Sequence, residues 1–229
     1  MGNVDFKKAL MGQFFKGSTE TGKVRPQVHE ALAKYFSTEG KGYTGSQFEL
    51  LISESDPFRF TERDFVALST LNVDVPERAA LWIMGAEGQA QTSALLEGIP
   101  NGVDIWKPEV ENAFADDGKL MQLWDCLGKA NWPTAAPGGG LGGSTKRSKL
   151  IAAKRPRLVP VLDKVVKDTL PKSENYWRAF QDVLRDDSCR EGLTLATNHD
   201  CVPPGVSLLR RIDVVIWMNN HEKHRKPKK

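Results

Sequence analysis

Apolar residues recur with the 3.6-residue period of an α-helix along almost the whole chain, and this period constrains the fold more than any other feature. The clearest stripe follows Pro26, a residue that is favoured in the first turn of a helix. Its members are Val28, Ala31, Leu32, Tyr35 and Phe36. Similar stripes occupy residues 65–68, 80–84, 120–127 and 177–184. The sequence therefore predicts an all-α fold.

Two local signals refine this prediction. Thr61 is a preferred N-cap residue and Asp64 stands three positions later, so we expect a capping box at the start of a helix. For residues 43–52 the sequence does not decide between helix and strand, because their apolar side chains alternate as they do in a strand.

Residues 206–218 are apolar on most sides and predict a buried central helix. Asp213 lies within this segment beside Arg210 and Arg211. A carboxylate in such apolar surroundings is stable mainly when it is paired, so we expect a buried ion pair here rather than a catalytic acid.

The chain shows no sign of a membrane or secretory location. It has no run of about 18 apolar residues that would span a bilayer. Residues 1–15 are amphipathic and lack the continuous apolar core of a signal peptide. The three cysteines are odd in number and irregularly spaced, which favours a reducing compartment. The sequence thus predicts a cytoplasmic protein without a membrane partner.

Metal binding has little support in the sequence. Cys189, His199 and Cys201 come nearest to a set of zinc ligands. They include no Cys-x-x-Cys pair, and a fourth ligand is not evident. We therefore expect neither a metal nor another cofactor.

Positive charge is concentrated in two segments of a chain whose net charge is only +3. Residues 138–172 hold nine Lys/Arg and two Asp, a local charge of +7. Residues 221–229 hold five Lys/Arg and one Glu, a local charge of +4, which leaves −8 for the rest. Such clusters favour an anionic partner, although a solvated helix face and a solubility tail are the structural alternatives.

Residues 133–143 contain five glycines and two prolines, a composition typical of a loop. The end of this segment leads directly into a basic helix predicted over residues 144–154. Glycines allow close approach of the backbone to a partner, and a helix start presents N–H groups and a positive dipole end. Together these features predict an anion site suited to a phosphate.

This segment resembles a known family. Gly140-Leu141-Gly142-Gly143-Ser144-Thr145 is similar to the glycine hairpin of the helix-hairpin-helix DNA glycosylases, and residues 159–163 are similar to the block that ends in their catalytic aspartate. The adenine-mismatch branch is nearest, because it has Ser where the endonuclease III branch has a nucleophilic Lys. Residues 154–166 and 209–218 also resemble an uncharacterised family common in actinobacteria.

The resemblance implies a two-lobed helix-hairpin-helix fold, duplex DNA as partner and base excision as activity. Asp163 and Ser144 occupy its catalytic positions, with Asp163 as the carboxylate that assists departure of a flipped base. Since Ser144 stands at the lysine position, no Schiff base is expected. The implied DNA contacts are Gly140, Gly142, Gly143, Thr145, Lys146, Arg147 and Lys149.

The chain departs from the family in two respects. It lacks the four-cysteine cluster of many members, which excludes that iron–sulfur centre. The spacing from Gly142 to Asp163 is 21 residues, about one more than the family has. Asp163 is also well placed to be an ordinary helix N-cap. A non-catalytic nucleic-acid-binding module of the same fold and a protein-interaction scaffold therefore stay open as alternatives.

We expect residues 1–229 to form a single compact helical unit with two lobes. One lobe is predicted over residues 27–170 and ends in the hairpin at 138–154. The other combines residues 1–26 with 171–219, and residues 220–229 form a basic tail.

Overall fold

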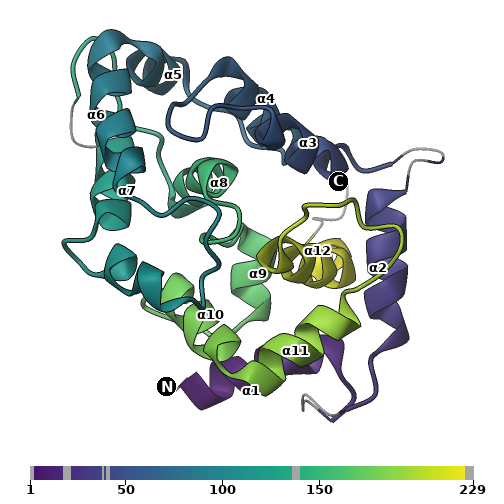
Figure 1. Cartoon of the computed structure of the whole chain (residues 1–229). Helices are drawn as coiled ribbons and strands as arrows, with labels where there is room; N and C mark the ends of the chain where they lie inside the picture. The colour runs from purple at the N-terminus through teal and green to yellow at the C-terminus, as the bar shows by residue number, and fades with distance from the viewer. Residues whose placement is uncertain (1–2, 18–21, 38, 40–41, 136–139, 225–229) are drawn as a thin grey trace. The chain divides into compact units, whose positions relative to one another are not determined.

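The computed structural model describes residues 3–17, 22–37, 39, 42–135 and 140–224. Within these ranges the chain is all-helical and has no strand beyond an isolated bridge between Phe15 and Val24 (Figure 1). The α-helices are α1 (Asn3–Phe14), α2 (Pro26–Phe36), α3 (Phe48–Ser53), α4 (Glu62–Thr70), α5 (Glu77–Met84), α6 (Ala86–Glu97), α7 (Lys119–Lys129), α8 (Ser144–Lys154), α9 (Lys164–Thr169), α10 (Tyr176–Arg185), α11 (Asp187–Ala196) and α12 (Leu208–Asn220). Short 3₁₀ helices are η1 (Thr44–Gln47), η2 (Pro108–Phe114) and η3 (His221–His224). The predicted all-α class is confirmed.

The chain divides into two compact units. Unit 1 comprises residues 1–43 and 162–229, and unit 2 comprises residues 44–161. These boundaries differ from the expected lobes, because residues 27–43 and 162–170 belong to unit 1. The physical reason is that α2 and α9 both pack against α12, whose apolar surface needs cover on several sides.

Helix α12 forms the centre of unit 1, as expected from its apolar character. Its buried polar pair is also as expected, since Arg210 forms an ion pair with Asp213 inside the unit. A second guanidinium nitrogen of Arg210 donates to the hydroxyl of Tyr35 on α2, at 2.5 Å. The pair therefore joins α12 to α2 as well as satisfying its own charges.

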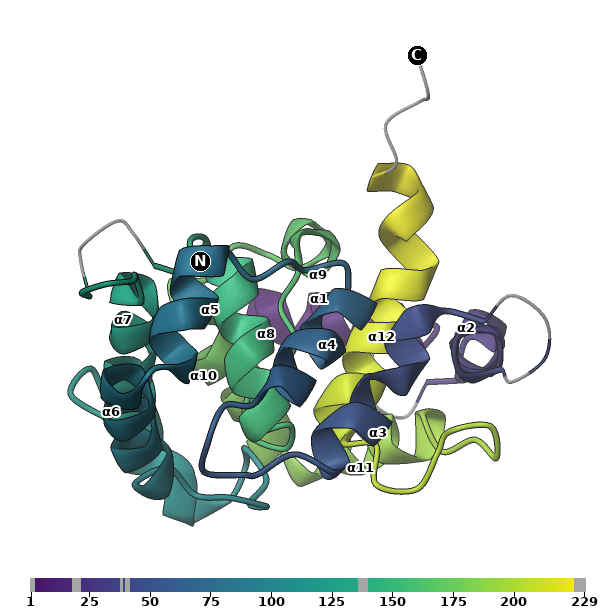
Figure 2. The same cartoon turned by 90° about the horizontal axis from the view of Figure 1, so that it is seen from above.

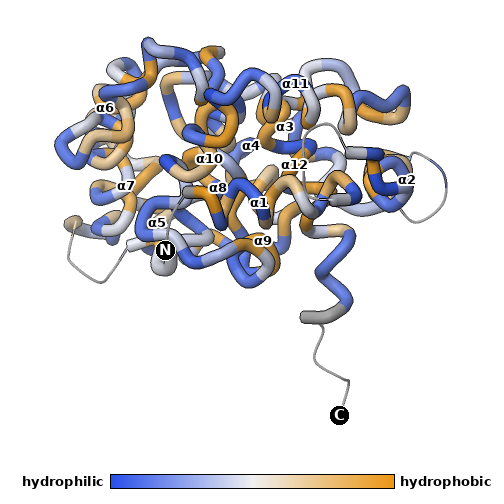
Figure 3. Tube along the Cα trace, turned by 90° about the horizontal axis from the view of Figure 1, so that it is seen from below, coloured by the Kyte–Doolittle hydropathy of each residue, from blue (hydrophilic) through white to orange (hydrophobic). Residues whose placement is uncertain are grey.

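Unit 2 is a group of packed helices in which α4 and α7 contact α8, and α6 contacts both α5 and α7 (Figures 1 and 2). Hydrophobic and hydrophilic residues are mixed along the trace (Figure 3), as expected for helices with one buried face. Residues 148–154 of α8 are all buried, including both lysines among them. The second half of α8 is thus a core helix of this unit.

Of residues 43–52, which the sequence left open, residues 44–52 are helical, with η1 followed by α3. Phe48 is buried, whereas Leu50 is exposed, so the alternation of apolar residues does not mark two faces of a strand. The capping box at the start of α4 is confirmed, because the Thr61 N–H donates to Asp64 Oδ2 at 2.7 Å.

In the described ranges, no helix has an apolar stretch long enough to cross a membrane.

Candidate functional site

The glycine hairpin connects α7 to α8 and is held by direct backbone contact. A Cβ atom at Gly140 would lie 2.2 Å from the carbonyl oxygen of Gly128, so only glycine fits there. The next residue, Leu141, is fully buried, and its N–H donates to the carbonyl of Leu127 at 3.0 Å. Gly142 has a φ of +65°, which favours glycine. Residues 138–139 of the predicted hairpin lie outside the described residues.

The hairpin presents the start of α8 to solvent. Gly142, Gly143 and Ser144 are exposed, and Gly143 occupies the N-cap position, where it has no side chain to cover the first turn. The first turn contains no acidic residue. The N–H groups in the first turn of a helix and the positive end of its dipole attract anions, so the local geometry suits a phosphate.

The three predicted phosphate-binding cations differ in how they are placed. Lys146 and Thr145 are partly exposed in the first turn of α8. The guanidinium of Arg147 lies 4.2 Å from the ring centroid of Trp124 and donates to the Trp124 carbonyl at 3.3 Å. Burial lowers the pKa of Arg147, opposed by the charge of Asp125. Arg147 therefore joins α8 to α7 and is only partly available to a ligand.

Lys149 does not present its charge to solvent. It is 6% exposed, and its Nζ donates to the carbonyl of Leu71 at 3.0 Å. The position was expected to contact DNA because it lies in a basic sequence. Tertiary packing turns it inward, since α4 covers that side of α8.

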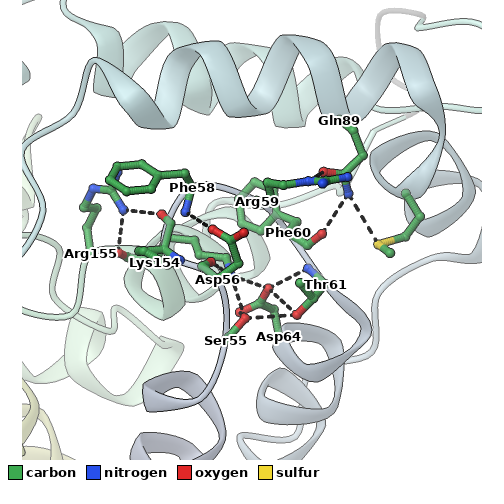
Figure 4. Close-up of polar contacts among 12 residues, drawn as sticks. Ser55, Asp56, Phe58, Arg59, Phe60, Thr61, Asp64, Gln89, Lys154 and Arg155 are labelled. Carbon is green, nitrogen blue, oxygen red and sulfur yellow. Dashed lines mark hydrogen bonds and ion pairs between the residues drawn. The ribbon is translucent and has the colours of Figure 1, made fainter.

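Lys154 and Arg155, which end the same basic run, are also buried. The Lys154 Nζ lies 2.5 Å from Asp64 Oδ2 and donates to the Ser55 hydroxyl at 2.8 Å and the Asp56 carbonyl at 2.7 Å (Figure 4). The side chains of Lys154 and Asp64 are 1% and 0% exposed. Burial lowers the pKa of Lys154, opposed by the Asp64 carboxylate. The ammonium group of Lys154 therefore binds groups within unit 2 and is not available to a ligand.

Arg155 is 1% exposed and binds backbone carbonyls rather than a carboxylate. It donates to the carbonyls of Pro57 at 2.8 Å and Ile99 at 3.1 Å, and also to that of Leu96. Leu96 lies in the last turn of α6, where a cation is favoured by the helix dipole. Burial lowers the pKa of Arg155 to about 10. Arg155 therefore holds the end of α6 against the loop before α4.

Asp163 is the N-cap of α9 in unit 1. Its Oδ1 accepts the N–H of Val166 at 2.9 Å, which is the structural role that the sequence left open. The side chain is half-buried. Nearby, burial lowers the pKa of Lys167, opposed by the charge of Asp163. Capping uses one of the two carboxylate oxygens of Asp163.

Two histidines approach each other in unit 1, and no local sequence pattern indicates this. The rings of His29 and His199 have centroids 5.2 Å apart, and the Cys201 N–H donates to His199 Nδ1 at 3.3 Å. Among the residues described, no three His, Cys, Asp or Glu side chains come together as a metal-binding group.

Comparison with known proteins places the chain in a family. A model described as "Family of unknown function (DUF6308)" matches residues 28–220. The chain belongs to the DUF6308 family. Searches of curated proteins and of solved structures returned no match. The part that matches the DUF6308 model includes the hairpin, α8, Asp163 and α12.

The close contact between Gly140 and Gly128 gives a test of the hairpin geometry. Gly140→Ala should lower the free energy of unfolding by about 1–3 kcal/mol, because the new methyl group meets backbone that must move. Gly98→Ala is the matched control, since its Cβ would press mainly on the flexible side chain of Lys119. Urea denaturation measures both changes, and equal stability of the two variants would contradict the contact.

Proposed function

We propose that this DUF6308 protein binds duplex DNA as a helix-hairpin-helix protein and excises a flipped base as a monofunctional DNA glycosylase. The observation that supports the proposal is the connection from α7 to α8. It combines a buried anchor at Leu141, an exposed glycine turn and a solvent-exposed helix start with glycine at the N-cap. These are the features that a backbone phosphate requires, and they depend on no particular base sequence.

In the proposed complex, N–H groups at the start of α8 bind one phosphate, and Lys146 adds attraction to its neighbours. Gly142 and Gly143, which are exposed, allow the DNA backbone to approach closely, and Gly140 supports the turn by packing on Gly128. Arg147 contributes a further charge while it stays stacked on Trp124. Lys149 is not part of this surface, because its ammonium group binds the Leu71 carbonyl.

The proposed chemistry uses Asp163. A negatively charged carboxylate would stabilise the sugar cation that develops as the base leaves, or activate the attacking water. Ser144, at the first position of α8, has no amine and forms no Schiff base, so strand cleavage by β-elimination is not expected. The hairpin belongs to unit 2. Asp163 belongs to unit 1, whose second segment begins at Leu162.

A second candidate function is a non-catalytic DNA-binding module of the same fold. The cap formed by Asp163 favours it, because the carboxylate then has a sufficient structural reason to be present. Both candidates require DNA binding at the hairpin, and they differ only in whether a base is released.

DNA binding is tested by a salt titration of the wild-type protein and two lysine variants. Binding of a fluorescent duplex should weaken steeply with salt, and Lys146→Ala should reduce the slope of log K against log salt by about 1. Lys107→Ala, an exposed lysine of unit 2 outside the hairpin, should leave the slope unchanged. Deletion of residues 221–229 should have a smaller effect than removal of the hairpin charge.

An absence of duplex binding at low salt would contradict both candidates and leave a protein-interaction scaffold as the alternative. A slope that changes equally in the Lys146 and Lys107 variants would show binding by general charge rather than by the hairpin.

A further inference from the structure

Trp132 is an exposed aromatic side chain near the hairpin. It is 51% exposed, whereas Trp82 and Trp177 are buried. Tryptophan is usually well buried, since its large apolar surface gains most from leaving water. Leu81 on α5 is similarly exposed, at 55%.

The backbone around Trp132 is fastened to α5. The Trp132 N–H donates to the Arg78 carbonyl at 3.0 Å, and the Arg78 Nη1 donates back to the Trp132 carbonyl at 3.3 Å. Leu81 lies three residues after Arg78, on the same side of α5. We call Arg78, Leu81 and Trp132 the Trp132 patch. It combines an exposed indole with a backbone that two hydrogen bonds hold to Arg78.

The Trp132 patch and the hairpin belong to the same unit and are close along the chain. Trp132 follows Gly128 by four residues, and Gly128 is the residue on which Gly140 packs. Four residues span at most about 14 Å even when fully extended. Phosphates along one DNA strand are spaced at about 3.4 Å of helix axis, so about four nucleotides cover the distance from Gly128 to Trp132.

We propose that Trp132 stacks on an unpaired base of DNA whose backbone is bound at the hairpin, an inference that rests on the proposed function. The face of an indole stacks on any base, and an Arg beside it adds attraction to the strand. A base is favoured over a protein partner because Trp132 lies within about 14 Å of Gly128, the residue against which the hairpin packs. The patch thereby prefers a duplex that contains an unpaired base over a fully paired one.

The test compares binding of the full chain to a short duplex with one bulged base and to the same duplex fully paired. Trp132→Ala should weaken binding of the bulged duplex by about 5- to 150-fold, the range for loss of one base–aromatic stack. Trp132→Phe should keep most of the affinity, because Phe retains a stacking face. Val66→Ala, another exposed apolar residue of unit 2, is the control and should bind as the wild type does.

The outcomes separate this inference from the proposed function. Trp132→Ala could bind the bulged duplex as tightly as the wild type does, while Lys146→Ala still reduces the salt slope. This result would overturn the role of Trp132 and leave the proposed DNA binding intact. Failure of the wild type to bind either duplex would overturn both. Loss of concentration-dependent self-association in Trp132→Ala, without an effect on DNA, would make the patch a protein interface and overturn the inference.

Discussion

Lys154→Met should lower the free energy of unfolding by about 3–5 kcal/mol, measured by urea denaturation. The substitution keeps a long unbranched side chain but leaves the Asp64 carboxylate buried without its partner at 2.5 Å. Water cannot replace that partner, because the Asp64 side chain is fully buried. The capping box stays in place, so the change reports the lost charge pair rather than the lost cap.

The same substitution at an exposed lysine is the matched control. Lys164 pairs with Asp168 one helical turn away, but the Lys164 side chain is 80% exposed, and Lys164→Met should change stability by less than about 1 kcal/mol. The double variant Lys154→Met/Asp64→Asn should recover part of the loss, because no uncompensated charge remains. Equal effects of the two lysine substitutions would contradict the buried pair.

If the protein is the proposed glycosylase, Asp163→Asn should reduce the rate of base excision by about 10²- to 10³-fold and leave folding and DNA binding unchanged. Asn keeps an oxygen that accepts the Val166 N–H, so stability should change by less than about 1 kcal/mol. The substitution removes the negative charge that would face a developing sugar cation. Affinity for duplex DNA should be equal or slightly higher, because a charge of the same sign as the phosphates is removed.

The measurement is release of a base from duplexes that contain mismatched, damaged or modified bases, with wild type and variant compared on each. If the wild type excises a base and the Asp163→Asn variant does not, the result supports the proposed glycosylase activity. Excision that the variant retains would remove Asp163 from the chemistry. DNA binding without excision by either protein, on any duplex, would favour the non-catalytic module.

The sequence alone was sufficient to predict local structure where the residues that interact lie close together in the chain. The period of apolar residues predicted α2 and α7, and Thr61 with Asp64 predicted the start of α4. Asp163 was placed correctly as a possible cap. In these cases the interacting groups are three or four residues apart, so neither fold nor partner helix changes the outcome.

Tertiary structure decided what the charges of α8 do. By sequence, Lys149, Lys154 and Arg155 form a basic run that suggests a ligand surface. Their partners are a carboxylate and carbonyls between 50 and 100 residues away in the chain, which no local pattern indicates. The sequence by itself determined helices such as α2 and α7, the caps of α4 and α9 and the glycine turn, because these depend on neighbouring residues. Which side of α8 faces water was decided only when α4 and α7 packed against it, since burial depends on the helices that cover a residue.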